Sequence, residues 1–100
     1  MKTVTICGSM RFAEEMKKIA LSLEIKHNWN VLQCVYNTEN RELTQNQIKA
    51  LEKAHLRKID LSDAIYVVDL DGYIGSSVRK EMEYAERSGK EIILNSAFSL

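Results

Sequence analysis

The stretch from Val67 to Glu81 carries the residues best suited to chemistry. It leaves an apolar run, passes through a loop with two glycines and two acids, and enters a helix that two serines open. In an α/β sheet, ligands bind at the carboxyl ends of strands and beside helix N-termini. Glu81 lies about one turn into the helix, so its carboxylate is predicted to face the mouth of a pocket. A carboxylate at that position could act as a nucleophile or stabilise a cationic centre.

Four residues around this loop are candidate ligands for a sugar or a phosphate: Asp69, Gly75, Ser76 and Ser77. Serine hydroxyls and helix amides bind phosphate, and an aspartate can orient sugar hydroxyls. Structural interpretations remain open for each of them. The serines could simply be N-cap residues, and Asp69 could be a turn residue at a strand end. Glu81 could likewise be a solvated acid on a charged helix.

A second candidate loop, residues 8–11, reads Gly-Ser-Met-Arg and follows the first apolar run. Gly8 would let the backbone approach a ligand, and Ser9 would offer a hydroxyl and an amide. Arg11 would pair with an anion held at the start of the following helix. An ordinary strand-to-helix turn with a serine N-cap explains the same residues equally well.

A regular alternation of strands and helices must position these loops. Strands are predicted at residues 3–7, 31–36, 64–68 and 91–94, and helices from residue 12 to about 26, from 44 to about 61, and from 77 to 88. Thr44 and Gln47 form a capping box, and Gly89 lies where a helix should end. Short links imply parallel strands with right-handed crossovers. We therefore predict an α/β fold, a small doubly wound, flavodoxin-like sheet in the order 2-1-3-4 with three main helices.

The predicted strand order brings the two candidate loops together. The first and third strands are neighbours, and their connections leave in opposite directions, which creates a crevice at the switch point. The loop after Cys7 and the loop after Val68 both border that crevice. We therefore expect one site built from both loops rather than two separate ones.

Composition limits the classes of partner. The 100 residues predict a single domain, 1–100, and 14 basic residues balance 14 acidic ones without a basic block. This argues against a nucleic-acid polymer and favours a small molecule. Without an apolar span or a signal-peptide pattern, the chain is predicted to be cytoplasmic, away from membranes. Cys7 and Cys34 are expected to be reduced core residues rather than metal ligands. A sheet this small is also expected to form a homodimer or higher oligomer.

Three motifs in sequence order resemble the nucleoside 2-deoxyribosyltransferase superfamily: residues 7–11, residues 62–64, and residues 75–77 followed by 81–85. The first reads Cys-Gly-Ser-Met-Arg, which is similar to the Cys-Gly-Ser-x-Arg loop of 2′-deoxynucleoside 5′-monophosphate N-glycosidases. The sequences of residues 58–63 and 72–75 look still more like those of small bacterial members of that superfamily. The resemblance covers most of the chain.

The resemblance implies that a glutamate attacks the anomeric carbon and forms a glycosyl-enzyme, which water or a second base then resolves. It assigns the nucleophile to Glu81, four residues before Ala85. It also assigns a 5′-phosphate clamp, formed by Ser9, Arg11, Gly75, Ser76 and Ser77.

Two positions depart from the pattern of the family. Thr5 stands where a tyrosine usually positions the nucleophile, and His55 stands where an aspartate usually protonates the leaving base. A histidine can act as a general acid near neutral pH. A histidine on an apolar helix stripe is also a common core residue.

The sequence therefore predicts an N-glycosidase or deoxyribosyl transferase for a nucleoside or its 5′-monophosphate, with Glu81 and His55 as catalytic residues and no cofactor. An alternative is a nucleotide or nucleotide-sugar binding module without turnover, which Thr5 and His55 favour. A flavin-binding, flavodoxin-like protein is a third possibility. The absence of a Ser/Thr-rich phosphate loop after the first strand counts against it.

Overall fold

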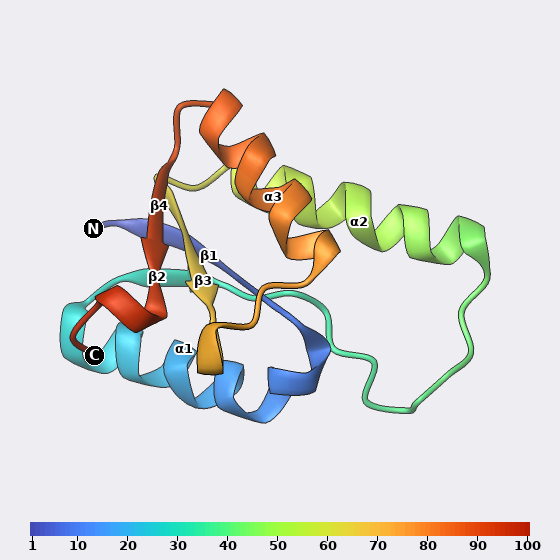
Figure 1. Ribbon diagram of the computed structural model, residues 1–100, viewed down its shortest axis with the longest axis horizontal. Helices are drawn as coiled ribbons and strands as arrows, with labels where there is room; N and C mark the ends of the chain where they lie inside the picture. The colour runs from blue at the N-terminus through green and yellow to red at the C-terminus, as the bar shows by residue number, and fades with distance from the viewer.

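A four-stranded parallel sheet organises the chain in the computed structural model, which describes residues 1–100 (Figure 1). Its strands are β1 (Thr3–Gly8), β2 (Asn30–Leu32), β3 (Ala64–Val68) and β4 (Glu91–Leu94). They lie in the order β2-β1-β3-β4, and every neighbouring pair is parallel. The predicted α/β fold and strand order are therefore confirmed.

Three helices cover the two faces of this sheet: α1 (Ala13–His27), α2 (Gln45–Asp60) and α3 (Ser76–Arg87). On one face, Met16 and Leu23 of α1 pack with Tyr66 of β3 in the larger buried cluster. On the other face, Ile59 of α2 and Val78 of α3 belong to a second cluster. Because side chains alternate along a strand, Ile6 joins the first cluster and Cys7 the second. None of the helices is both long enough and apolar enough to span a membrane.

The second strand is shorter than the sequence indicates. We predicted residues 31–36, whereas β2 spans Asn30–Leu32 and pairs only with β1. Beyond Leu32 the chain leaves the edge of the sheet, yet Cys34 and Tyr36 still pack against the larger cluster, while Val35 is exposed. The apolar alternation at residues 31–36 thus reflects side-chain packing on the core, which continues beyond the last residue that pairs with β1.

Local capping signals set the helix ends as expected. The capping box is present at α2. The backbone N–H of Gln47 donates to Thr44 Oγ1 at 3.2 Å, and the backbone N–H of Thr44 donates to Gln47 Oε1 at 2.9 Å. Beyond α3, Gly89 has a φ of 72°, and the Lys90 amide returns to the Ala85 carbonyl at 2.9 Å. This left-handed turn is the type that glycine ends helices with.

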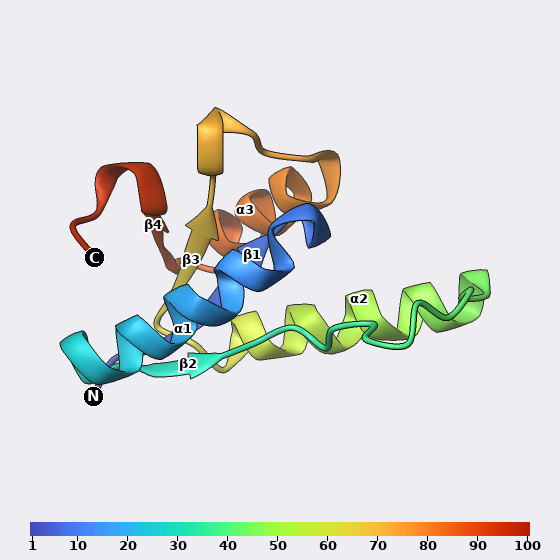
Figure 2. The same ribbon diagram turned by 90° about the horizontal axis from the view of Figure 1, so that it is seen from below.

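The first half of α2 and the segment 33–44 extend well beyond the sheet (Figure 2). This segment contains no helix or strand and connects β2 to α2. Its apolar residues Val35 and Leu43 therefore lie near the projecting helix rather than over the sheet, and both line the same cavity as Ile48 and Leu51 of α2.

Candidate functional site

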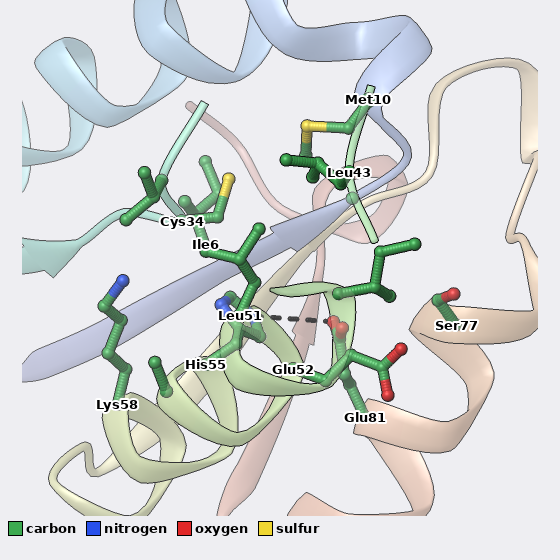
Figure 3. Close-up of a pocket in the computed structure, with 14 residues that line it drawn as sticks. Ile6, Met10, Cys34, Leu43, Leu51, Glu52, His55, Lys58, Ser77 and Glu81 are labelled. Carbon is green, nitrogen blue, oxygen red and sulfur yellow. Dashed lines mark ion pairs between the residues drawn. The ribbon is translucent and has the colours of Figure 1, made fainter. Parts of the chain in front are cut away.

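A cavity of about 270 Å³ lies at the carboxyl end of β1, between α2, the start of α3 and the segment 33–44 (Figure 3). Most of its wall is apolar and comes from Ile6, Met10, Val35, Leu43, Ile48 and Leu51. Its polar lining comes mainly from the two helices and comprises Glu52, His55, Lys58, Ser77 and Glu81. An apolar pocket with a few convergent polar groups is typical of small-molecule sites.

Glu81 and His55 meet at this cavity. Glu81 Oε1 lies 3.5 Å from His55 Nε2, and the side chains are 22% and 11% exposed (Figure 3). Each residue lies on or next to the buried stripe of its helix: His55 is one turn before Ile59, and Glu81 is between Val78 and Ala85. Since both stripes face the same side of the sheet, helix packing brings the carboxylate and the imidazole together.

Cys7 of β1 also contacts His55, although it does not line the cavity. It is 1% exposed, and its sulfur lies 3.4 Å from His55 Nε2. Burial raises the pKa of the Cys7 thiol well above its ordinary value of 9.0, and the neighbouring Glu81 carboxylate raises it further. The thiol is therefore protonated at neutral pH. Sequence analysis treated Cys7 as a core residue and missed its contact with the predicted catalytic pair.

The surroundings of His55 favour one proton position. Its Nδ1 atom is buried and has no hydrogen-bond partner, whereas Nε2 lies between the Glu81 carboxylate and the Cys7 sulfur. A proton on Nδ1 would lack an acceptor and would cost more than a bare nitrogen there. In the neutral ring, the geometry thus favours the tautomer that carries its proton on Nε2 and donates toward Glu81.

Thr5 has a different role from the tyrosine that the resemblance places at its position. It is fully buried, and its hydroxyl lies 2.6 Å from the Ser62 hydroxyl, which donates to the Lys58 carbonyl at 2.8 Å. These bonds tie β1 to the end of α2. No hydrogen bond joins Thr5 to Glu81, and His55 and Cys7 are the side chains that contact the carboxylate instead.

The first loop combines close packing with an exposed cation. A Cβ on Gly8 would lie 2.9 Å from Met16 Sδ and 3.2 Å from Val68 Cβ, so a side chain here would require the buried Met16 side chain to shift. Ser9 Oγ accepts from the Arg11 amide at 3.3 Å. The Arg11 guanidinium stacks 3.9 Å from the centre of the Tyr73 ring, which brings it to the second loop.

The second loop delivers the chain into α3. Gly75 is the N-cap residue, and its carbonyl accepts from the Arg79 amide at 3.0 Å. The Tyr73 hydroxyl lies 3.4 Å from the position of a Gly75 Cβ. Tyr73 therefore contacts both Arg11 and Gly75, and it joins the first loop to the N-terminus of α3. The amides at that terminus carry a partial positive charge.

Asp69 lies outside the cavity. It is 6% exposed, and its two carboxylate oxygens accept from the Ser96 amide at 2.8 Å and the Ser96 hydroxyl at 2.6 Å. These bonds fasten the turn after β4, the 3-10 helix Asn95–Ala97, to the end of β3. The structure therefore gives Asp69 a bridging role that neither of its sequence interpretations anticipated.

Four of the predicted site residues line the cavity: Gly8, His55, Ser77 and Glu81. Of the others, apart from Asp69, Ser9 and Arg11 lie in the loop after β1, and Gly75 and Ser76 lie at the N-terminus of α3. Sequence analysis also missed Lys58, although its position one turn after His55 places it on the same side of α2. No protein-family model matches the chain, and no curated protein matches it in sequence.

Proposed function

We propose that this protein cleaves or transfers the N-glycosidic bond of a nucleoside, a deoxynucleoside or a 5′-monophosphate, with Glu81 as the nucleophile. One observation carries the proposal: the Glu81 carboxylate borders an apolar cavity and lies 3.5 Å from an imidazole nitrogen. No backbone amide or hydroxyl donates to this carboxylate. Apart from its contacts with His55 and Cys7, the carboxylate therefore keeps open acceptor positions from which it could attack an electron-poor carbon.

The apolar part of the cavity suits a nucleobase. Leu43, Ile48 and Leu51 contribute apolar wall to the cavity, and Glu81 of α3 lines the same cavity. A base held there would direct its glycosidic bond toward the carboxylate. Glu52 and Lys58 also line the cavity and could form hydrogen bonds with base edges.

The loops beside Glu81 suit a phosphate. The N-terminus of α3, with Ser77 on the cavity wall, supplies amides and a hydroxyl, and Arg11 reaches this region across Tyr73. An arginine and helix amides together form a strong phosphate site. We therefore favour a 5′-monophosphate over an unphosphorylated nucleoside.

His55 is the proposed general acid. Its Nε2 atom lies beside Glu81, where the glycosidic bond would break; the imidazolium form would give its Nε2 proton to the leaving base as the bond lengthens, which leaves the neutral ring. The buried position of the ring keeps it in one orientation, between Cys7 and Glu81. The attack would proceed through a cationic sugar-like transition state next to the carboxylate, as in retaining glycosidases.

Chromatographic measurement of free base tests this proposal. Nucleoside and deoxynucleoside 5′-monophosphates would be compared with the unphosphorylated nucleosides, with and without an acceptor base. We expect release by the wild-type protein, faster for monophosphates, and no release by Glu81→Gln. Asp69→Asn is the matched control because it makes the same chemical change in a carboxylate outside the cavity. Binding without any base release would instead identify a binding module.

We also propose that the protein works as a homodimer in the cytoplasm. Apolar side chains beside the cavity are exposed to solvent, including Val35 at 65% and Leu51 at 39%. A second chain could cover them and narrow the cavity. Light scattering should give twice the mass of one chain, and a monomer at high micromolar concentration would contradict this part of the proposal.

A further inference from the structure

Cys7, His55 and Glu81 bring three different metal-ligating groups together at the cavity. The Cys7 sulfur lies 3.4 Å from His55 Nε2, which lies 3.5 Å from Glu81 Oε1, and the three ligand atoms all fall within 4.8 Å of one another. They come from β1, α2 and α3, respectively. Thiolate, imidazole and carboxylate are the three ligand types that Zn²⁺ takes from proteins.

The spacing fits a tetrahedral ion. Zinc–ligand bonds of about 2.0–2.3 Å imply that neighbouring ligand atoms lie about 3.3–3.6 Å apart. Two of the three separations, 3.4 and 3.5 Å, already have this length. Both involve His55 Nε2, so an ion could bind this nitrogen with only small rotations of the Cys7 and Glu81 side chains.

The charges also fit. A thiolate and a carboxylate together neutralise a divalent cation, so the loaded site would carry no net charge in a place where Cys7 is 1% exposed. Neither Cys7 nor Glu81 is paired with a lysine or arginine that an incoming cation would have to displace. Three protein ligands with a fourth position toward a cavity are the arrangement of an accessible zinc site.

We propose that Cys7, His55 and Glu81 form a three-ligand site for Zn²⁺ or a similar divalent ion, and that the ion switches the proposed activity off. On binding, the Cys7 thiol gives its proton to solvent and the sulfur bonds the metal. The His55 proton moves from Nε2 to Nδ1, and one Glu81 oxygen becomes a ligand. The carboxylate is then no longer available to attack a sugar. Only this inhibitory consequence rests on the proposed function, whereas metal binding stands independently of it.

The affinity has a structural limit. His55 Nδ1 is buried without a partner, so the proton that it receives would have no acceptor. Loss of the hydrogen-bond acceptor for the second ring nitrogen of a ligating histidine costs about 10–100-fold in metal affinity. We therefore expect reversible binding, which suits an inhibitory ion better than a permanent structural one.

Cobalt titration of the metal-free protein tests the site without any substrate. We expect one Co²⁺ per chain, with a thiolate-to-cobalt charge-transfer band and the visible bands of tetrahedral cobalt, both removed by added Zn²⁺. Cys7→Ser should lose the charge-transfer band, and Glu81→Gln should keep it but bind about 10–100-fold more weakly. Cys34→Ser is the matched control and should keep the band, because Cys34 is outside the three-ligand cluster. Circular dichroism would establish that each variant is folded.

The result that overturns the proposal is the absence of a thiolate band in the wild-type protein, or a band that depends on Cys34 instead of Cys7. Failure of the proposed function looks different: the protein would bind cobalt but release no base from any substrate. A protein that releases base at the same rate with and without stoichiometric Zn²⁺ would contradict the inhibitory site while leaving the glycosidase proposal intact.

Discussion

Glu81 and Asp69 are two shielded carboxylates on either side of β3, and their partners differ in kind. Asp69 accepts two short hydrogen bonds from Ser96, at 2.8 and 2.6 Å, and is 6% exposed. The nearest polar groups to Glu81 are an imidazole nitrogen at 3.5 Å and a buried thiol, and its side chain is 22% exposed at the cavity. Short bonds that occupy both oxygens make a carboxylate a structural bridge, whereas a carboxylate with open acceptor positions can react.

The surroundings of the two carboxylates differ in the same way. Near Asp69, Tyr66 donates to Asn95 Oδ1 at 2.5 Å, and Phe98 packs edge-on against the Tyr66 ring, 5.7 Å between centres. These contacts close that side of the sheet. The wall beside Glu81 instead includes the segment 33–44, which belongs to no strand or helix. The molecule thus has a closed side, built around Asp69, and an open side, built around Glu81.

The sharpest test of this comparison is Glu81→Gln. The amide keeps the shape of the carboxylate but cannot attack carbon, so we expect base release to fall by about 10³-fold or more. Stability should change by less than about 1 kcal/mol, because the wild-type side chain makes only long contacts with His55 and Cys7. Chromatography and urea unfolding measure the two effects. A stable, fully active Glu81→Gln protein would contradict the proposal that the Glu81 carboxylate reacts with the substrate.

Substitution of His55 should have the next largest effect. His55→Gln removes the proposed general acid, and we expect kcat to fall by about 10²-fold or more. The loss should shrink for substrates whose base leaves without protonation, because such bases do not need the acid. Steady-state rates over a series of bases measure this. An equal loss for every base would indicate that His55 only positions Glu81.

Asp69→Asn should show the opposite pattern. One oxygen becomes an NH₂ group that faces a donor from Ser96, so we expect a loss of about 1–3 kcal/mol in the free energy of unfolding. The folded fraction should release base at a rate within a few-fold of the wild-type rate. Urea unfolding followed by the assay under folded conditions tests both. A specific loss of kcat in a stable variant would move Asp69 into the reactive site.

Substitution of Arg11 tests whether the proposed substrate site on the open side extends to the loop after β1. Its guanidinium stacks on Tyr73 beside the N-terminus of α3. Arg11→Ala should raise KM for a 5′-monophosphate about tenfold and leave the unphosphorylated nucleoside unaffected, since the lost charge-assisted bond involves only the phosphate. Tyr73→Phe keeps the stacking ring and is the matched control. An equal rise in KM for both substrates would show that Arg11 shapes the cavity rather than binding phosphate.

The smallest expected effect is on alkaline stability. In the folded protein, the Cys7 thiol has a pKa well above the ordinary 9.0. Its contribution to the free energy of unfolding is therefore complete below pH 9.0 and is lost as the pH rises further. The free energy of unfolding should then fall by up to about 1.4 kcal/mol per pH unit. Cys7→Ala should remove this slope, whatever its effect on absolute stability. Urea unfolding of both proteins across that range measures it, and an unchanged slope would contradict the assignment.

Tyr66 provides the matching comparison on the closed side. Burial, followed by the Asp69 charge, raises the pKa of Tyr66 from 10.0 to about 12. Its contribution to stability should therefore be complete below pH 10.0 and disappear toward pH 12. Tyr66→Phe should affect the pH dependence only in this higher window, which separates the closed side from the open one.

Local sequence signals predicted the elements of the fold well. The apolar run of β3, the capping box at Thr44 and the terminating Gly89 each depend on neighbouring residues, and each is confirmed. The end of β2 could not be predicted in this way, because Cys34 and Tyr36 keep the strand pattern while packing on the core without a pairing strand.

The site was less predictable for a related reason. Helical periodicity placed His55 on an apolar stripe, and its position one turn into a helix placed Glu81 at the mouth of a pocket, but their 3.5 Å approach depends on how α2 and α3 pack together. Cys7 has no spacing signal toward either residue, since each comes from a different element. Asp69 has the same local setting as a ligand residue, and only the return of the chain at Ser96 gives it another partner.

Trapping the glycosyl-enzyme is the most direct test that Glu81 is the nucleophile. A 2′-fluoro 5′-monophosphate analogue with a good leaving base should release that base and then stall, because the fluorine slows both formation and hydrolysis of the glycosyl-enzyme while the leaving base speeds only its formation. Intact-protein mass spectrometry should show the added sugar phosphate, and peptide mapping should place it on Glu81. The adduct should form in Asp69→Asn and be absent in Glu81→Gln. A label on another residue, or one that persists in Glu81→Gln, would contradict the assignment.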